Sequence, residues 1–363
     1  MVALFDPIRI GALDLANRIV MAPLTRNRAA PGQVASKLAV EYYRQRASAG
    51  LIITEGSQIS PEAQGYVDTP GIYNAGQVAA WRCVTEAVHA EGGRIVVQLW
   101  HVGRVSHVSL QPNGKAPVSS TARQAETKTF LREGFVPVSA PRALSAAEIP
   151  ALVASYADAA RRAMDAGFDG VEVHGANGYL IDQFLRDSIN DRKDEYGGAI
   201  GKRVRFLVEV MQAVVDAIGG ARTGLRLSPV TPSNDARQDS NPQALFEHAV
   251  AQLAPLGLAF IEVVEGQTAG ARDFAPFDYA ALRHRFNGAW MVNNGYDRRM
   301  AIDAVAAHRA DLVSFGRLFI SNPDLVRRLR DNAPLNAPDP RTFYGGGVKG
   351  YVDYPTLEEP ATA

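Results

Sequence analysis

Residues 145–176, SAAEIPALVASYADAARRAMDAGFDGVEVHGA, contain the pattern that decides the fold. The first part reads as a helix, because Ser145 stands three residues before Glu148 in capping-box spacing and Gly167 follows the last apolar turn. The last part, GVEVHGA (170–176), is a short apolar run typical of a buried strand. A helix followed at once by a buried strand is the unit from which α/β folds are built.

The same kind of buried strand recurs along the chain. Seven further runs are RIVMAPLT (18–25), LIITEG (51–56), RIVVQLWH (94–101), TGLRLSP (223–229), FIEVVEG (260–266), AWMVNNG (289–295) and LVSFGR (312–317). Helical patterns lie between most of them, including residues 36–50, 201–219 and 297–309. Eight continuous apolar strands alternating with helices predict a closed (β/α)8 barrel, the TIM-barrel form of the α/β class. The alternative is a doubly wound open sheet, but no linker divides the chain as that fold would require.

Two segments fall outside this repeat. Residues 2–17 hold two short apolar stretches around Gly11, which predict a hairpin that closes the bottom of the barrel. Residues 103–143 form a long insertion after the third strand, rich in Ser, Pro, Gly and Arg. A loop of that length in a compact domain is usually a lid or a binding loop. We therefore expect residues 1–363 to form one domain with a capping insertion inside it.

Composition narrows the class of protein. Apolar residues make up 47% of the chain, and 38 basic residues balance 38 acidic ones, so no net field would attract nucleic acid. No apolar run is long enough to span a membrane, and the start lacks the features of a signal peptide. The single cysteine, Cys83, excludes an internal disulfide, and His101 with His107 lacks a third metal ligand. We expect a soluble cytoplasmic protein without metal, either a monomer or a homodimer.

In a barrel of this kind, chemistry occurs at the carboxyl ends of the strands. The last two strands end in Asn294-Gly295 and Gly316-Arg317, and turns at this position commonly hold a phosphate. A glycine lets backbone N–H groups approach phosphate oxygens, and an arginine adds a bidentate contact. The alternative is that the first pair is a plain turn and that Arg317 caps a helix or forms an ion pair on the surface.

Arg226 is unusual because its guanidinium lies within an apolar strand, LRLSP. A buried cation needs an anion, which leaves two interpretations. Arg226 either faces an anion in the barrel mouth or forms an ion pair with a strand carboxylate such as Glu262.

Three polar side chains crowd the end of the fourth strand. His174 and Asn177 can each donate an N–H to one carbonyl oxygen, and Tyr179 can act as an acid. The alternative is a hydrogen-bonded core histidine, a common Asn-Gly turn and a core tyrosine. The strands contain no lysine for Schiff-base chemistry, and no GxSxG motif is present. Glu55 and Glu265 could still serve as the carboxylate pair of a glycosidase.

Seven ordered segments resemble the Old Yellow Enzyme family over essentially the whole chain. They are LFDPIRIGALDLANRIVMAPLTR, QLWHVGRVSH, HGANGYLIDQFLRDSINDRKDEYGG, LRLSP, NNGYD, FGRLFISNPDL and FYGGGVKGYVDYP. The chain is most similar to the classical branch and to its bacterial N-ethylmaleimide and xenobiotic reductases, because Thr25 stands where the other main branch has a cysteine.

The resemblance implies bound FMN and a role for each strand end. Residues expected to contact FMN are Pro23, Leu24, Thr25, Gly56, Gln98, Arg226, Asn294, Gly295, Gly316 and Arg317. Residues expected to line the substrate space are Tyr66, Trp100, His174, Asn177, Gln267 and Tyr344. His174 and Asn177 would hold the substrate oxygen, and Tyr179 would donate the proton.

The resemblance also implies the reaction. NADPH, or NADH, would reduce FMN, and flavin N5 would pass hydride to the activated C=C bond of an α,β-unsaturated carbonyl compound such as an enone or a maleimide. Nitrate esters, nitro compounds and quinones are alternative substrates of the same site. Arg132 and Arg142 are candidates for the extra phosphate of NADPH. A flavin-free barrel hydrolase is the rival from another class.

Overall fold

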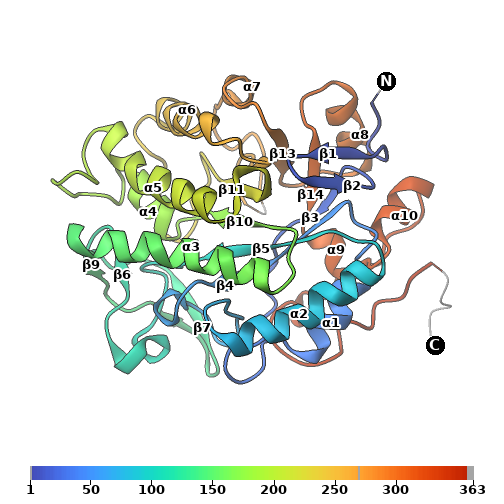
Figure 1. Cartoon of the computed structure of the whole chain (residues 1–363), viewed down its shortest axis with the longest axis horizontal. Coiled ribbons are helices and arrows are strands. Elements are labelled where there is room, and N and C mark those ends of the chain that lie inside the picture. Colours follow the sequence, from blue (N-terminus) through green and yellow to red (C-terminus); the bar gives the residue numbers. More distant parts are fainter. Residues whose placement is uncertain (1, 269, 358–363) are drawn as a thin grey trace.

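The computed structural model describes residues 2–268 and 270–357, and within them eight parallel strands close into a barrel (Figure 1). Strand β14 pairs with β3, which closes the ring. The predicted (β/α)8 barrel is therefore confirmed. In chain order the barrel strands are β3 (Ile19–Met21), β4 (Leu51–Gln58), β5 (Ile95–Trp100), β10 (Gly170–His174), β11 (Thr223–Leu227), β12 (Phe260–Val264), β13 (Ala289–Asn293) and β14 (Leu312–Phe315).

Helices follow the strands and cover the outside of the barrel (Figure 1). They are α1 (Lys37–Arg44), α2 (Ala75–Ala90), α3 (Ile149–Asp165), α4 (Leu180–Leu185), α5 (Ile200–Ile218), α6 (Pro242–Leu253), α7 (Tyr279–Arg283), α8 (Arg298–Ala306), α9 (Arg317–Ser321) and α10 (Leu325–Asp331). Among the helices of the described residues, none combines the length and apolar character needed to cross a membrane.

The helix signals in the sequence were correct at the start of both helices and at the end of one, since Gly167 follows the C-cap of α3 with φ +84°. Ser36 caps α1 by accepting the N–H of Ala39, as predicted, but the helix ends at Arg44, well before Gly50. The capping box of Ser145 is present, although it caps a 3-10 turn that leads directly into α3.

The N-terminal hairpin closes the bottom of the barrel as expected. Strands β1 (Ile8–Ile10) and β2 (Leu13–Leu15) pair antiparallel, and their buried apolar side chains join a cluster with inward residues of the barrel strands. Gly11 adopts φ +52°, and a Cβ there would lie 2.3 Å from the carbonyl oxygen of Ala221. Only glycine lets the hairpin approach the barrel so closely.

The insertion at 103–143 folds over the carboxyl end of β5. It contains β6 (Val118–Ser119), the hairpin β7 (Lys128–Leu131) and β8 (Gly134–Pro137), and β9 (Arg142–Ala143). The N–H of Val67 donates to the carbonyl of Phe130 at 2.9 Å, and Trp100 packs with buried apolar residues of the insertion. The predicted capping insertion is therefore present.

The C-terminal segment returns to the same end of the barrel. Arg26 donates to the carbonyl oxygens of Phe343 at 2.9 Å and Gly350 at 2.7 Å. The rings of Tyr42 and Tyr351 stack with their centroids 4.2 Å apart. These contacts hold residues 343–350 beside the loop that follows β3.

Candidate active site

Four aromatic side chains converge at the carboxyl ends of β4, β5 and β10. The hydroxyls of Tyr66 and Tyr179 are 3.0 Å apart. The Tyr66 ring stacks on Trp100 with centroids 5.6 Å apart, and Tyr179 meets Trp100 edge to face at 5.1 Å. The His174 ring lies 5.3 Å from that of Tyr179. Residues that are far apart in the sequence thus form one wall.

Gly56 allows this wall to form. Its register partner on β5 is Gln98, and the indole of Trp100 lies directly over the glycine. A Cβ at position 56 would be 2.6 Å from the indole ring, which no side chain could tolerate without moving Trp100.

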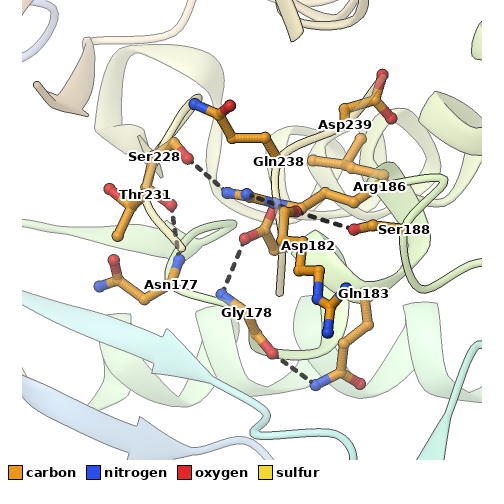
Figure 2. A network of polar contacts seen from close by, with 12 residues as sticks. Asn177, Gly178, Asp182, Gln183, Arg186, Ser188, Ser228, Thr231, Gln238 and Asp239 are labelled. Carbon is orange, nitrogen blue, oxygen red and sulfur yellow. Dashed lines mark hydrogen bonds and ion pairs between the residues drawn. The ribbon is translucent and has the colours of Figure 1, made fainter. Parts of the chain in front are cut away.

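The turn at Asn177 and Gly178 is fixed through its backbone (Figure 2). Both residues adopt positive φ, +58° and +75°. The N–H of Asn177 donates to Ser228 Oγ at 2.8 Å, and the N–H of Gly178 donates to Asp182 Oδ2 at 2.8 Å. Gln183 Nε2 donates to the carbonyl of Gly178 at 2.8 Å. This pinned turn sets the direction of the side chains on either side of it.

Arg186 links the turn to the end of β11. Its Nε donates to Asp182 at 2.8 Å and a terminal nitrogen donates to the carbonyl of Ser228 at 2.6 Å, with both ionised side chains fully buried (Figure 2). The sequence analysis missed these residues. The i,i+4 spacing of Asp182 and Arg186 could have indicated the ion pair, whereas Ser228 gave no local signal.

The side chain of Asn177 has a defined orientation. Its Oδ1 accepts a hydrogen bond from Thr268 Oγ1 at 3.0 Å. The amide nitrogen therefore remains available as a donor. Asn234 Nδ2 donates to the backbone carbonyl of Asn177 at 2.9 Å. Thr268 and Asn234 come from loops after two other strands, so the sequence around Asn177 could not reveal them.

Burial fixes the protonation of the reactive side chains. Desolvation, followed by the charge of Arg226, lowers the pKa of His174 well below its ordinary value, so the imidazole is neutral. Desolvation raises the pKa of Tyr179 and places that of Tyr66 well above the ordinary value, so both phenols stay protonated. The wall therefore offers neutral hydrogen-bond donors, and Tyr179 holds a proton.

Arg226 forms an ion pair with Glu262, which was one of the two interpretations of its burial. Its Nε is 3.0 Å from Glu262 Oε2, and a terminal nitrogen donates to Asn293 Oδ1 at 3.1 Å. Arg226 is the register neighbour of His174, so the guanidinium borders the aromatic wall. On the other side of the wall, Gln98 Nε2 donates to Glu172 at 2.8 Å.

A cavity of about 740 Å³ opens at the ends of β13 and β14. Gly295 and Gly316 line it together with Arg298, Arg299 and Arg317. Gly295 adopts φ +66° with open space around its missing Cβ. In the described part of the chain the side chain of Arg317, the first residue of α9, makes no hydrogen bond or ion pair. Open glycine backbone and an uncompensated cation fit the phosphate of a cofactor.

Other predicted contact residues lie nearby or turn away. Pro23, Leu24 and Thr25 are half-buried after β3, and Leu24 lies 3.3 Å from where a Cβ of Gly316 would stand. Asn294 directs its amide nitrogen to the carbonyls of Glu265 at 2.8 Å and Gln267 at 2.7 Å and does not line the cavity, unlike its neighbours Asn293 and Gly295. Tyr344 is 53% exposed, and Gln267 is half-buried with its side chain folded against Gly270.

Glu55 and Glu265 do not form a carboxylate pair. Their strands, β4 and β12, are separated by three strands in either direction around the barrel. Glu55 accepts the N–H of Arg26 at 3.3 Å, and Glu265 accepts the hydroxyl of Tyr296 at 2.7 Å. This arrangement removes the geometric basis of the glycosidase alternative. Residues 2–268 and 270–357 hold no cluster of three or more His, Cys, Asp or Glu suited to a metal.

A barrel with a cavity that fits a phosphate and a wall of neutral hydrogen-bond donors is compatible with a flavin oxidoreductase. The model of the NADH:flavin oxidoreductase / NADH oxidase family matches residues 3–336, and the chain belongs to that family. 12-Oxophytodienoate reductase 1 of Oryza sativa subsp. japonica is 47% identical over 368 residues, covering 99% of this chain and 94% of the relative.

Solved structures give the same result. Morphinone reductase in complex with tetrahydroNAD superimposes with a TM-score of 0.93 at 46% identity, covering all of both chains. The Old Yellow Enzyme homologue from Zymomonas mobilis gives 0.93 at 44% identity, covering 98% of this chain and all of that one. The resemblance to the Old Yellow Enzyme family is confirmed.

Proposed function

We propose that the protein is an FMN-dependent NAD(P)H oxidoreductase that reduces the activated C=C bond of α,β-unsaturated carbonyl compounds. The observation that carries the proposal is that one barrel holds, at the carboxyl ends of its strands, both the Trp100, His174 and Tyr179 wall and a cavity suited to a phosphate. The relatives named 12-oxophytodienoate reductase and morphinone reductase support reductive chemistry at this site.

FMN, when bound, supplies the hydride. His174 is neutral and can donate one ring N–H to the substrate oxygen, and Asn177 can donate from its free amide nitrogen. Two donors at that oxygen draw electron density from the conjugated bond, which makes the β-carbon electrophilic. Tyr179 stays protonated before hydride transfer, because burial disfavours the phenolate. It can then donate that proton to the α-carbon.

The nicotinamide donor is proposed as NADPH or NADH. Arg132 and Arg142, the candidates for the extra phosphate of NADPH, both have carboxylate partners already. Arg132 lies 2.8 Å from Asp68, and Arg142 lies 2.7 Å from Glu148. These exposed ion pairs are weak, so a phosphate could still compete for either arginine. Turnover with each nucleotide decides the preference.

The natural substrate stays a prediction, with enones and maleimides first and nitrate esters, nitro compounds and quinones as alternatives. Turnover of one member of each class under the same nicotinamide donor ranks them. A cytoplasmic location and a monomeric or homodimeric state also stay predictions.

The visible spectrum of the purified protein, before and after addition of a simple phenol, tests the proposal. A flavin absorption that gains a long-wavelength charge-transfer band is expected, because a phenolate held by His174 and Asn177 would stack on the flavin. The double change His174→Ala and Asn177→Ala should abolish the band but keep the flavin. A protein that stays colourless after incubation with FMN would refute the proposal.

A further inference from the structure

A layer of polar side chains lies inside the barrel above its apolar bottom. Its members project from six neighbouring strands. Four of them lie two residues beyond Val96, Phe260, Met291 and Leu312 of the apolar bottom, and Glu172 and Arg226 lie two residues beyond Gly170 and Gly224, so all six share the inward face. Glu172 and Glu262 in this layer have no exposed surface, and Arg226 is only 7% exposed. The full layer is Gln98, Glu172, Arg226, Glu262, Asn293 and Ser314.

The layer contains two carboxyl groups but one cation. Glu262 has the partners of an ionised carboxylate, since Arg226 approaches one oxygen at 3.0 Å and the hydroxyl of Ser314 donates to the other. Within the described residues Glu172 forms no ion pair; it accepts a hydrogen bond from Gln98 at 2.8 Å and is influenced by the charge of Arg226 and by the carboxyl of Glu262. With both carboxyls ionised, the layer would hold a buried negative charge without compensation, which is costly.

The oxygens that lack donors indicate how the excess charge is removed. Within the described residues, Glu172 Oε2 has no hydrogen-bond partner, and Glu262 Oε2 has only the ion-pair contact with Arg226 and no hydrogen bond. One proton between the two carboxyls would satisfy both atoms and leave the layer neutral.

We propose that Glu172 and Glu262 share one proton, and that Glu172 is a positioning residue that sets the charge and hydrogen bonds that the layer presents to the barrel mouth. The inference rests on the proposed function, because a flavin is the group that would meet this layer. Burial, and then the charge of Glu262, raise the pKa of Glu172 well above its ordinary value, in agreement with the geometry.

The other groups that face Glu172 add no further carboxyl and no further cation to the layer. His174 is neutral, and Arg226 and Glu262 are the charged groups of the layer. Gln98, Asn293 and Ser314 complete it without titrating. The shared proton therefore decides whether the layer is neutral or negative.

The consequence concerns a reduced flavin, which carries negative charge. A neutral layer leaves the guanidinium of Arg226 offset by a single carboxylate, whereas a second carboxylate would repel the reduced cofactor. Glu172 also holds the amide nitrogen of Gln98, so the carbonyl oxygen of that amide is free to accept a hydrogen bond from the cofactor.

Infrared spectroscopy of the protein with isotope-labelled glutamate tests the shared proton directly. The carbonyl band of a protonated carboxylic acid should appear at a pH well above about 7, the pKa of Glu55, and should shift in deuterated water. The band should vanish in Glu172→Gln and in Glu262→Gln, because a single remaining carboxyl ionises to pair with Arg226. It should remain in Glu55→Gln. A wild-type spectrum without the band would overturn the proposal.

The midpoint potential of the bound flavin supplies the second readout. Glu172→Gln replaces a protonated acid by a neutral amide, so the potential should stay close to that of the wild type. The double variant Glu172→Gln/Glu262→Gln leaves the charge of Arg226 uncompensated. It should therefore favour the reduced flavin over the oxidised flavin on the order of tenfold. A potential that rises in Glu172→Gln alone would show that Glu172 is ionised, and would overturn the proposal.

The two readouts separate this inference from the proposed function. A protein that binds no flavin yields no potential, yet the infrared band still decides whether the carboxyls share a proton. If Glu172→Gln does not fold, Glu262→Gln provides the same infrared test.

Discussion

Tyr179 is the side chain whose surroundings most narrowly limit its chemistry. Its hydroxyl lies 3.0 Å from that of Tyr66, and its ring packs edge to face on Trp100. Burial raises its pKa, so the phenol keeps its proton, as the acid role that we propose for it requires. The neighbouring phenol of Tyr66 also stays protonated and can donate to the oxygen that Tyr179 retains after proton transfer.

Replacing Tyr179 by phenylalanine should separate the two half-reactions. Reduction of an enone should slow by roughly 10²- to 10⁴-fold, the usual contribution of a general acid, while reduction of the flavin by NAD(P)H stays close to wild type. Stopped-flow absorbance of the flavin follows each half-reaction separately. Tyr196→Phe is a matched control, because its hydroxyl binds Glu209 away from the mouth. An equal loss in both half-reactions would mean that Tyr179 is structural.

At the scale of elements, the start of α4 is fixed to the end of β11. The turn at Asn177 and Gly178 has left-handed backbone, which an asparagine adopts only at some cost. Ser228, directly after β11, and Asp182 from α4 accept its two N–H groups and so stabilise that conformation. The direction of Asn177 thus depends on a neighbouring strand.

Ser228→Ala tests this dependence. The N–H of Asn177 would lose its partner in a partly buried site, which costs about 1 kcal/mol of stability. The affinity for a phenol should fall roughly tenfold because Asn177 is less well oriented. Denaturant unfolding and titration of the charge-transfer band measure the two effects.

Ser188→Ala is the matched control for this experiment. The Ser188 hydroxyl donates to the carbonyl of Arg237 in the same network but does not contact the turn (Figure 2). It should leave phenol affinity unchanged. Loss of affinity in Ser188→Ala as large as in Ser228→Ala would contradict a specific role for the Ser228 hydroxyl.

At the scale of the whole molecule, a buried carboxyl lies where the C-terminal segment meets the barrel. Glu55 is 3% exposed, and burial raises its pKa to about 7 although Arg26 and Arg28 oppose the shift. The same two arginines bind carbonyl oxygens of residues 342–350. The charge of Glu55 therefore affects the junction that closes the fold.

The stability of the protein should depend on pH through Glu55. Between pH 4.5, its ordinary pKa, and about pH 7, the folded protein keeps a proton that the unfolded chain releases. Stability from this group is present below pH 4.5 and is lost as the pH rises to about 7, by up to about 3 kcal/mol. Glu55→Gln should remove that part of the slope when unfolding is measured across this range.

The exposed residue Glu126 provides the matched control, because Glu126→Gln removes a carboxyl without changing the junction. The comparison with wild type cancels the contributions of other buried groups, such as His101, whose pKa burial lowers to about 3. Parallel pH profiles of wild type and Glu55→Gln would refute the assignment.

The sequence by itself determined the barrel, its strand order and most strand ends. Each strand is a continuous apolar run, because both faces of the barrel sheet are buried. The regular alternation of such runs with helical patterns is therefore enough to predict the fold. It also placed Arg226 beside Glu262 as one of two alternatives, since a buried cation requires an anion.

Only the tertiary structure decided which side chains meet. Tyr66 contacts Tyr179, Ser228 binds Asn177, and Glu172 lies in the same polar layer as Arg226. These contacts form because closure of the barrel brings together strands that are far apart in the sequence. Hydrogen-bond partners and burial depend on those distances, and so do the protonation states of Glu172, His174 and Tyr179. A local pattern carries no information about them, because the approach of the partners is set by strand tilt and register across the whole ring.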